Sequence, residues 1–184
     1  MTAKRALGRL LRKAYSGELA AAHAYRGHAR SVRDAAQREA IRGIEDDEWR
    51  HRQRVGEMLA ELSVRPARAR EVVFYCIGKL IALSCFLGGW FIPMYGAGRI
   101  ERRNIVEYEV AARLAQRAGY ETWVDELLEM AEVEWDHEQY FGECVRGHWL
   151  YRWFPNWPSA GTREAIRQRF ASQSEADSAA MGGA

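Results

Sequence analysis

The chain has 184 residues, of which 48% are hydrophobic and 28% are charged, a balance typical of a single soluble globular domain. Its net charge of +2 is too small to favour nucleic-acid binding, and the sequence has no glycine-rich phosphate loop. Its three cysteines form no CxxC pair, which favours neither a disulfide framework nor a zinc ribbon, so we expect a reducing, cytoplasmic location.

Long helices account for most of the chain in our interpretation. Only Pro66 and Pro93 precede Tyr140, so few positions interrupt a helix. We predict four long helices, at residues 2–32, 34–63, 98–118 and 121–146. Short connections make the first two an antiparallel hairpin, and the last two another. The predicted fold class is therefore all-α, a four-helix bundle.

The segment between the two hairpins, residues 72–95, is apolar, with Lys79 as its only charge. Lys79, Gly88, Gly89 and Pro93 interrupt it, which disfavours a membrane span. A helix of this length would reach about 36 Å, enough to run along a four-helix bundle. We predict an apolar helical crossover whose outer face is covered by a second subunit, a membrane interface or an apolar ligand.

The C-terminal part of the chain differs in composition. An aromatic-rich stretch follows Gly147, and a tail of Ser, Ala and Gly comes after it. We predict that the aromatic side chains form a flap over an apolar surface, with an interfacial anchor as the alternative. We expect disorder from about Ser172. The predicted domains are residues 1–150 for the bundle and 151–184 for the aromatic segment and tail.

A repeated tetrapeptide carries the first functional signal. The sequence reads EWRH at residues 48–51 and EWDH at residues 134–137. Residues three apart on a helix face the same way, so each tetrapeptide presents a carboxylate beside an imidazole. A di-iron carboxylate bundle needs two such motifs and one inward glutamate from each of the other two helices. The motifs therefore supply half of a metal site.

The remaining ligands follow from the symmetry of the hairpins. Glu18 and Glu48 lie nearly equidistant from the first turn, so they should face each other. Glu107 and Glu109 compete to face Glu134 across the second turn, and they point in different directions on the helix. We choose Glu107 because its distance from the second turn is closer to that of Glu134. The predicted metal ligands are Glu18, Glu48, His51, Glu107, Glu134 and His137.

The chemistry of these donors favours two iron ions as the cofactor. Four buried carboxylates without cations would be costly, whereas two Fe(II) ions balance their charge. Carboxylates with imidazoles suit iron or manganese, and the absence of thiolates argues against a structural zinc. The alternative is that these residues are solvated charges on a metal-free helical interaction module.

Three other residues share the helix of Glu18. Tyr25 lies two turns beyond Glu18 on the same face, where it could support a ligand or belong to the core. His23 and His28 have no partner at ligand spacing, so we interpret them as surface or pocket-lining residues rather than metal ligands.

Several segments of the chain, taken in order, resemble the demethoxyubiquinone hydroxylase family of ferritin-like proteins. The resemblance rests on SGELAAAHAYRGH at residues 16–28, EWRH, Val-Arg-Pro at 64–66, the apolar crossover, IVEYEV at 105–110 and EVEWDH at 132–137. It covers about residues 9–142. Members usually show histidines and a tyrosine shortly after the third ligand glutamate, where this chain, counted from Glu107, has Ala112, Arg113 and Leu114.

The resemblance implies a membrane-associated di-iron monooxygenase that hydroxylates the ring of a polyprenyl quinone precursor with O2. It also implies that the crossover forms a quinone channel and docks on the cytoplasmic face of a membrane. Electrons must come from a donor that the sequence does not identify. The alternative function is an iron-handling or peroxide-scavenging ferritin-like protein, which would use the same ligands but needs no apolar channel.

Overall fold

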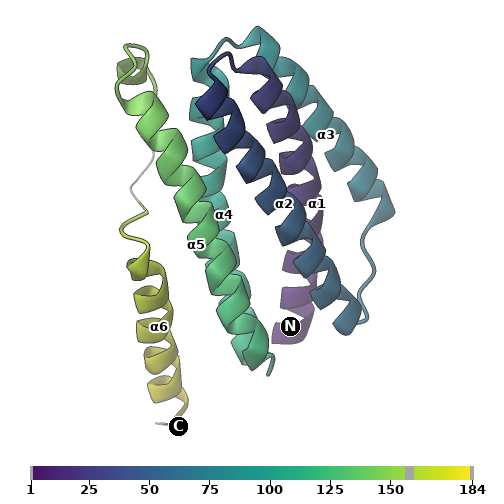
Figure 1. Ribbon diagram of the computed structural model, residues 1–184. Coiled ribbons are helices and arrows are strands. Elements are labelled where there is room, and N and C mark those ends of the chain that lie inside the picture. Colours follow the sequence, from purple (N-terminus) through teal and green to yellow (C-terminus); the bar gives the residue numbers. More distant parts are fainter. Residues whose placement is uncertain (1, 156–159, 183–184) are drawn as a thin grey trace.

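The computed structural model describes residues 2–155 and 160–182, and it contains only helices and loops within them. The elements are α1 (Ala3–Ser31), α2 (Ala35–Glu61), α3 (Arg68–Leu87), α4 (Phe91–Arg117), α5 (Glu121–Arg146), the 3-10 helix η1 (Tyr151–Trp153) and α6 (Glu164–Gly182). Helices α1, α2, α4 and α5 form a bundle of two antiparallel hairpins, and α3 lies outside it along α1 (Figure 1). The predicted all-α bundle with a helical crossover is confirmed.

Local sequence signals set the turns of both hairpins. Asp34 caps α2, since its side chain accepts a hydrogen bond of 2.8 Å from the backbone N–H of Gln37. Gly119 separates α4 from α5 with a φ of +81°, a left-handed conformation that favours glycine. The two short connections therefore lie where the sequence predicts them.

The crossover differs from its predicted extent. Instead of one apolar segment through residue 95, α3 ends at Leu87 and Gly89 adopts a φ of +65°. Helix α4 then begins at Phe91, well before the predicted start at residue 98. Pro93 does not prevent this start, because the missing N–H of a proline has no consequence in the first turn of a helix.

Two glycines allow α3 to lie very close to α1. A Cβ atom on Gly27 of α1 would lie 2.3 Å from the Cβ of Ala82, and one on Gly78 of α3 would lie 2.6 Å from the carbonyl oxygen of Ala20. Both distances are well below van der Waals contact, and both involve atoms on or next to the backbone. Side chains at these positions would therefore push the two helices apart.

We expect Gly27→Ala to lower the free energy of unfolding by about 1–3 kcal/mol, because overpacking against backbone forces α3 to move. Gly43→Ala is the matched control, since a Cβ there meets no atom within 4 Å. That variant should be more stable by about 0.5–1 kcal/mol, the helix-propensity difference between the two residues. Urea denaturation checks both values, and equal effects of the two substitutions would contradict close packing of α3.

The core consists of two apolar clusters at different heights in the bundle. One contains Leu11, Val55 and Leu127, and the other contains Ile41 and Phe141. In each of the four bundle helices, a stretch between the two clusters carries buried polar side chains. A polar layer therefore crosses an otherwise apolar bundle, and it needs a chemical explanation.

The outward face of α3 is apolar and exposed. Its exposed side chains include Val72, Val73, Tyr75, Ile77, Leu80, Ile81, Leu83, Phe86 and Leu87. We call these residues the α3 apolar face. Such a large contiguous patch is unusual on a protein that has no partner there. Within the described residues, no helix combines the length and apolar character that crossing a bilayer requires.

A helix that the sequence does not predict, α6, lies in the C-terminal region. It runs to Gly182 and so includes residues from about Ser172 onward, for which we predict disorder. The side chain of Ile166 is fully buried in the same core as Leu127. Arg169 donates a hydrogen bond to the buried Glu109 on α4, and Arg167 pairs with the buried Glu132 on α5. These contacts hold α6 against the second hairpin.

The predicted aromatic flap is formed in part. The ring of Phe154 lies 5.1 Å from that of Phe91 and 5.0 Å from that of Tyr95, and so covers the apolar start of α4. Trp149 and Trp153 remain exposed. The rest of the predicted flap, at residues 156–159, lies outside the described residues.

Candidate metal centre

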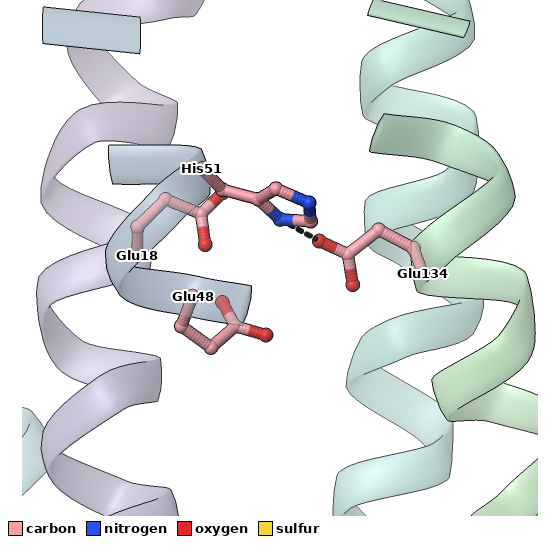
Figure 2. A group of neighbouring side chains, drawn as sticks. All are labelled: Glu18, Glu48, His51 and Glu134. Carbon is pink, nitrogen blue, oxygen red and sulfur yellow. Dashed lines mark hydrogen bonds and ion pairs between the residues drawn. The ribbon is translucent and has the colours of Figure 1, made fainter. Parts of the chain in front are cut away.

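Six buried carboxylate and imidazole side chains meet in the polar layer. They are Glu18 from α1, Glu48 and His51 from α2, Glu101 from α4, and Glu134 and His137 from α5. Potential ligand atoms of Glu18, Glu48, His51 and Glu134 lie within 4.8 Å of one another, as do those of Glu48, Glu101, Glu134 and His137. Figure 2 shows the first group, with Glu134 facing the three residues of α1 and α2. Glu48 and Glu134 belong to both groups, so each could serve both of two ions.

The two Glu-x-x-His motifs contact each other reciprocally. Nδ1 of His51 lies 3.1 Å from a carboxylate oxygen of Glu134, as the dashed line in Figure 2 marks. Nδ1 of His137 lies 3.8 Å from a carboxylate oxygen of Glu48. Each histidine therefore faces the glutamate of the opposite motif, and an approximate twofold symmetry relates α2 to α5.

Two tyrosines extend this symmetry to α1 and α4. The hydroxyl of Tyr25 on α1 donates to Glu101 on α4, and the hydroxyl of Tyr108 on α4 donates to Glu18 on α1. Each tyrosine follows the glutamate of its own helix by seven residues and binds the glutamate of the other helix. The pattern Glu-x6-Tyr thus occurs twice, as does Glu-x-x-His.

The structure brings together five of the six predicted ligands but not Glu107. That side chain forms an ion pair with Lys13 at the wall of a cavity, and its rival Glu109 pairs with Arg169. Glu101 stands in the cluster instead. It lies 18 residues from Gly119, as does His137, so it is level with the histidine of the opposite motif rather than with Glu134.

Several buried polar atoms of the cluster have no hydrogen-bond partner in the described part of the chain. They are both carboxylate oxygens of Glu48, one of Glu134 and Nδ1 of His137. Burying such groups unpaired costs several kcal/mol in general. Because the unpaired atoms are all acceptors or potential ligands pointing into one space, a cation there would satisfy them together.

The pKa shifts of the carboxylates also favour a bound cation. Burial raises the pKa of Glu18, and it raises the pKa of Glu48 and Glu101 well above the usual range, with the charge of Glu134 adding to both. Burial also opposes ionisation of Glu134, but the adjacent imidazoles of His137 and His51 outweigh it and lower its pKa. Four carboxylates so close together cannot all ionise without added positive charge.

A carboxylate outside the cluster orients one of the histidines. Nε2 of His137 lies 3.0 Å from Asp47 on α2. A ligand histidine commonly donates its second ring N–H to such a carboxylate, which fixes its tautomer and leaves the other nitrogen free for a metal. Here the free nitrogen is Nδ1, the atom that has no hydrogen-bond partner.

A cavity of about 830 Å³ reaches the cluster between α1, α3 and α4. Glu18, Tyr25 and Tyr108 lie in its wall, and most of its other lining side chains are apolar. Leu87 lines the cavity and is also 82% exposed as part of the α3 apolar face. The cavity therefore connects the polar layer with the exposed apolar surface.

The donor set fits two transition-metal ions with a preference for oxygen and nitrogen ligands. Four carboxylates and two imidazoles suit iron or manganese, and no thiolate takes part. One glutamate from each of two helices and a Glu-x-x-His motif from each of the other two is the pattern of di-iron carboxylate bundles. Fold and site together place the protein in the ferritin-like class.

Residues 5–102 match the family described as "Ubiquinone biosynthesis protein COQ7". The match spans more than half of the chain, and the chain belongs to this family. It includes Glu18, Glu48, His51 and Glu101, whereas Glu134 and His137 lie beyond it. The resemblance noted in the sequence is thereby confirmed, and the family is one of hydroxylases in ubiquinone biosynthesis. Comparisons with curated proteins and with solved structures gave no match.

Proposed function

We propose that the chain is a di-iron monooxygenase that hydroxylates the ring of a quinone-like aromatic substrate. The observation that carries the proposal is the apolar cavity, because Glu18, Tyr25 and Tyr108 form part of its wall. In the reaction, one atom of O2 enters a ring C–H bond as hydroxyl. The other leaves as water, with two electrons from an external reductant and two protons. Two iron ions bound in the cluster would supply the reductive activation of O2.

The chain's own residues would hold the ions and shape the site. Glu48 and Glu134 would each serve both ions, because both donor groups contain them. Glu18, His51, Glu101 and His137 complete the set, so that Glu101 replaces Glu107 in our ligand assignment. The hydroxyls of Tyr25 and Tyr108 donate to Glu101 and Glu18, which restricts the orientation of these two carboxylates.

The cavity supports the monooxygenase over the iron-handling alternative. A protein that only oxidises or stores iron needs access for ions, and a mostly apolar cavity of this size offers poor access to them. An aromatic ring with a hydrocarbon tail, in contrast, gains free energy by leaving water for such a lining. We therefore infer an apolar aromatic substrate.

The connection between the cavity and the α3 apolar face supports a peripheral position on a membrane. A polyprenyl substrate resides in the bilayer, and the α3 apolar face leads directly into the cavity through Leu87. Exposed Arg68, Arg70 and Lys79 lie on the same helix, where they can interact with anionic lipid headgroups. We propose that α3 docks on a membrane surface so that the substrate can enter without crossing water.

Metal loading followed by turnover tests the proposed function. The purified chain, loaded anaerobically with Fe(II), should bind two ions. On addition of O2, a reductant and a short-chain methoxy-benzoquinol, it should form the hydroxylated ring, detected by mass spectrometry with one atom from ¹⁸O2. The His51→Ala/His137→Ala double variant should lose iron and product, because it removes both imidazoles.

The outcomes separate the possible functions. Stoichiometric iron oxidation without any hydroxylated product would favour the iron-handling function. Failure of the wild-type chain to bind iron would support the metal-free interaction module. An unchanged iron content in the double variant, with circular dichroism like that of the wild type, would show that the ligand assignment is wrong.

A further inference from the structure

Among the polar side chains in the cavity wall that take no part in the metal cluster, His28 is the one that is almost fully buried and carries an unpaired ring nitrogen in the described part of the chain. His28 lies on α1 near its C-terminal end and lines the cavity, as does Lys13 fifteen residues before it. The rise of a helix separates these two residues by about 22 Å along α1. Glu18 and Tyr25 lie between them, so His28 and Lys13 mark opposite ends of the cavity along this helix.

The His28 imidazole is held rigidly by aromatic neighbours. Its ring is stacked on that of Phe141 at 5.9 Å and 13°, and on that of Tyr25 at 6.4 Å and 24°. The residue is only 3% exposed. Tyr25 in turn donates to Glu101. The position of the imidazole relative to the cluster is therefore fixed through one intervening side chain.

His28 has unused hydrogen-bonding capacity. Its Nε2 atom is buried and has no hydrogen-bond partner among the described residues. Burial lowers the pKa of His28 to about 4, so the ring is neutral at physiological pH and offers one N–H donor and one lone pair. Leaving such a group unpaired in an apolar site is costly, so a hydrogen-bonding group in the adjoining cavity would stabilise it.

Few other groups in this part of the cavity could bind a polar substituent. The lining residues of α1 from position 20 onward are alanines apart from Tyr25 and His28, and the Tyr25 hydroxyl already donates to Glu101. Ser84 of α3 donates to the carbonyl oxygen of Ile81. A lone water would find too few polar partners here to be held well.

We infer that His28 is a positioning residue that hydrogen-bonds a ring oxygen of the aromatic substrate and so sets which ring carbon faces the metal cluster. The inference rests on the proposed function, since it needs an aromatic ring carrying oxygen substituents. A substrate with ring oxygens pairs with the imidazole, whereas a hydrocarbon ring of the same shape leaves it unpaired. His28 thereby selects oxygenated rings over plain hydrocarbons.

Equilibrium binding to the iron-loaded, anaerobic protein tests this role without turnover. The two probes are a methoxy-benzoquinone bearing one prenyl unit and prenylbenzene, which has no ring oxygen. His28→Phe keeps the aromatic stacking and should weaken quinone binding about tenfold, the usual effect of losing one hydrogen bond, while prenylbenzene binding stays within about twofold. His28→Gln restores a donor and an acceptor and should recover most of the quinone affinity.

His23→Phe is the matched control, because His23 lies on the same helix but does not line the cavity. It should leave the binding of both probes unchanged. Iron content and thermal unfolding verify each variant, and His28→Leu replaces His28→Phe if the latter loses iron.

Equal weakening of both probes in the apolar His28 variants would show that the residue only packs, and no change in either would show that it has no role. Both results overturn the inference but leave the proposed function intact. If the wild-type protein binds neither probe, the proposed substrate class itself fails.

Discussion

Glu101→Ala is expected to reduce iron binding from two ions per chain to one or none, whereas Glu107→Ala should retain two. Glu101 is fully buried and lies within 4.8 Å of ligand atoms of Glu48, Glu134 and His137. Glu107 forms an ion pair with Lys13, whose side chain is 45% exposed, and pairs of this kind contribute about 0–1 kcal/mol. Metal analysis after anaerobic loading, with the absorption spectrum after O2 exposure, measures the difference.

Glu109→Ala provides a second control, since this carboxylate pairs with Arg169 of α6. It should keep both ions, although it leaves the arginine without its partner and should loosen α6. Thermal unfolding distinguishes the two effects. If Glu107→Ala loses iron while Glu101→Ala keeps it, the ligand predicted from hairpin symmetry is correct and our revised assignment is wrong.

The fold could be predicted from the sequence because its signals are local. Scarce prolines, an Asp34 cap and a glycine at position 119 specify two helical hairpins without any knowledge of tertiary contacts. The end of α3 was harder to place. Residues 72–95 are apolar throughout, so hydrophobicity does not mark the break at Gly88 and Gly89. That break depends on backbone conformation, which glycine permits but does not dictate.

Hairpin symmetry predicts Glu107, whereas the structure places Glu101 in the cluster. The residue as far from Gly119 as Glu134 is Asn104, which is not a carboxylate but donates to Glu101. The pattern Glu-x6-Tyr, present as Glu18–Tyr25 and again as Glu101–Tyr108, is the sequence signal that marks the glutamate found in the cluster. Counted from Glu101, the tyrosine that the family resemblance predicts after the third ligand is Tyr108.

Helix α6 could not be predicted from its own residues. Its sequence is polar and its C-terminal half is rich in Ser and Ala, which is typical of a disordered tail. What holds α6 is contact with other helices, since Ile166 is buried in the core and Arg167 and Arg169 contact Glu132 and Glu109. These pairings join residues that are distant in the sequence, so they cannot be recognised from the residues of α6 alone.

Leu83→Asp is expected to weaken binding to phospholipid vesicles about tenfold or more while leaving iron binding intact. Leu83 is 59% exposed on the α3 apolar face and does not line the cavity, so a carboxylate there is solvated in the free protein. At the membrane it removes a buried leucine, which contributes about 1.5–3 kcal/mol, and adds a charge that must stay hydrated. Sedimentation with vesicles of phosphatidylcholine and phosphatidylglycerol measures the change.

Ala60→Asp is the matched control, because it adds the same charge at an exposed position of α2. It should bind vesicles like the wild type. Activity separates docking from catalysis: Leu83→Asp should lose turnover of a long-chain quinol embedded in vesicles but keep turnover of a short-chain soluble one. If the folded, iron-loaded variant binds vesicles and oxidises the embedded substrate like the wild type, then α3 is not the docking surface, and its apolar face is covered by another copy of the chain or by a protein partner. Failure of the wild type to bind vesicles would rule out the peripheral position altogether.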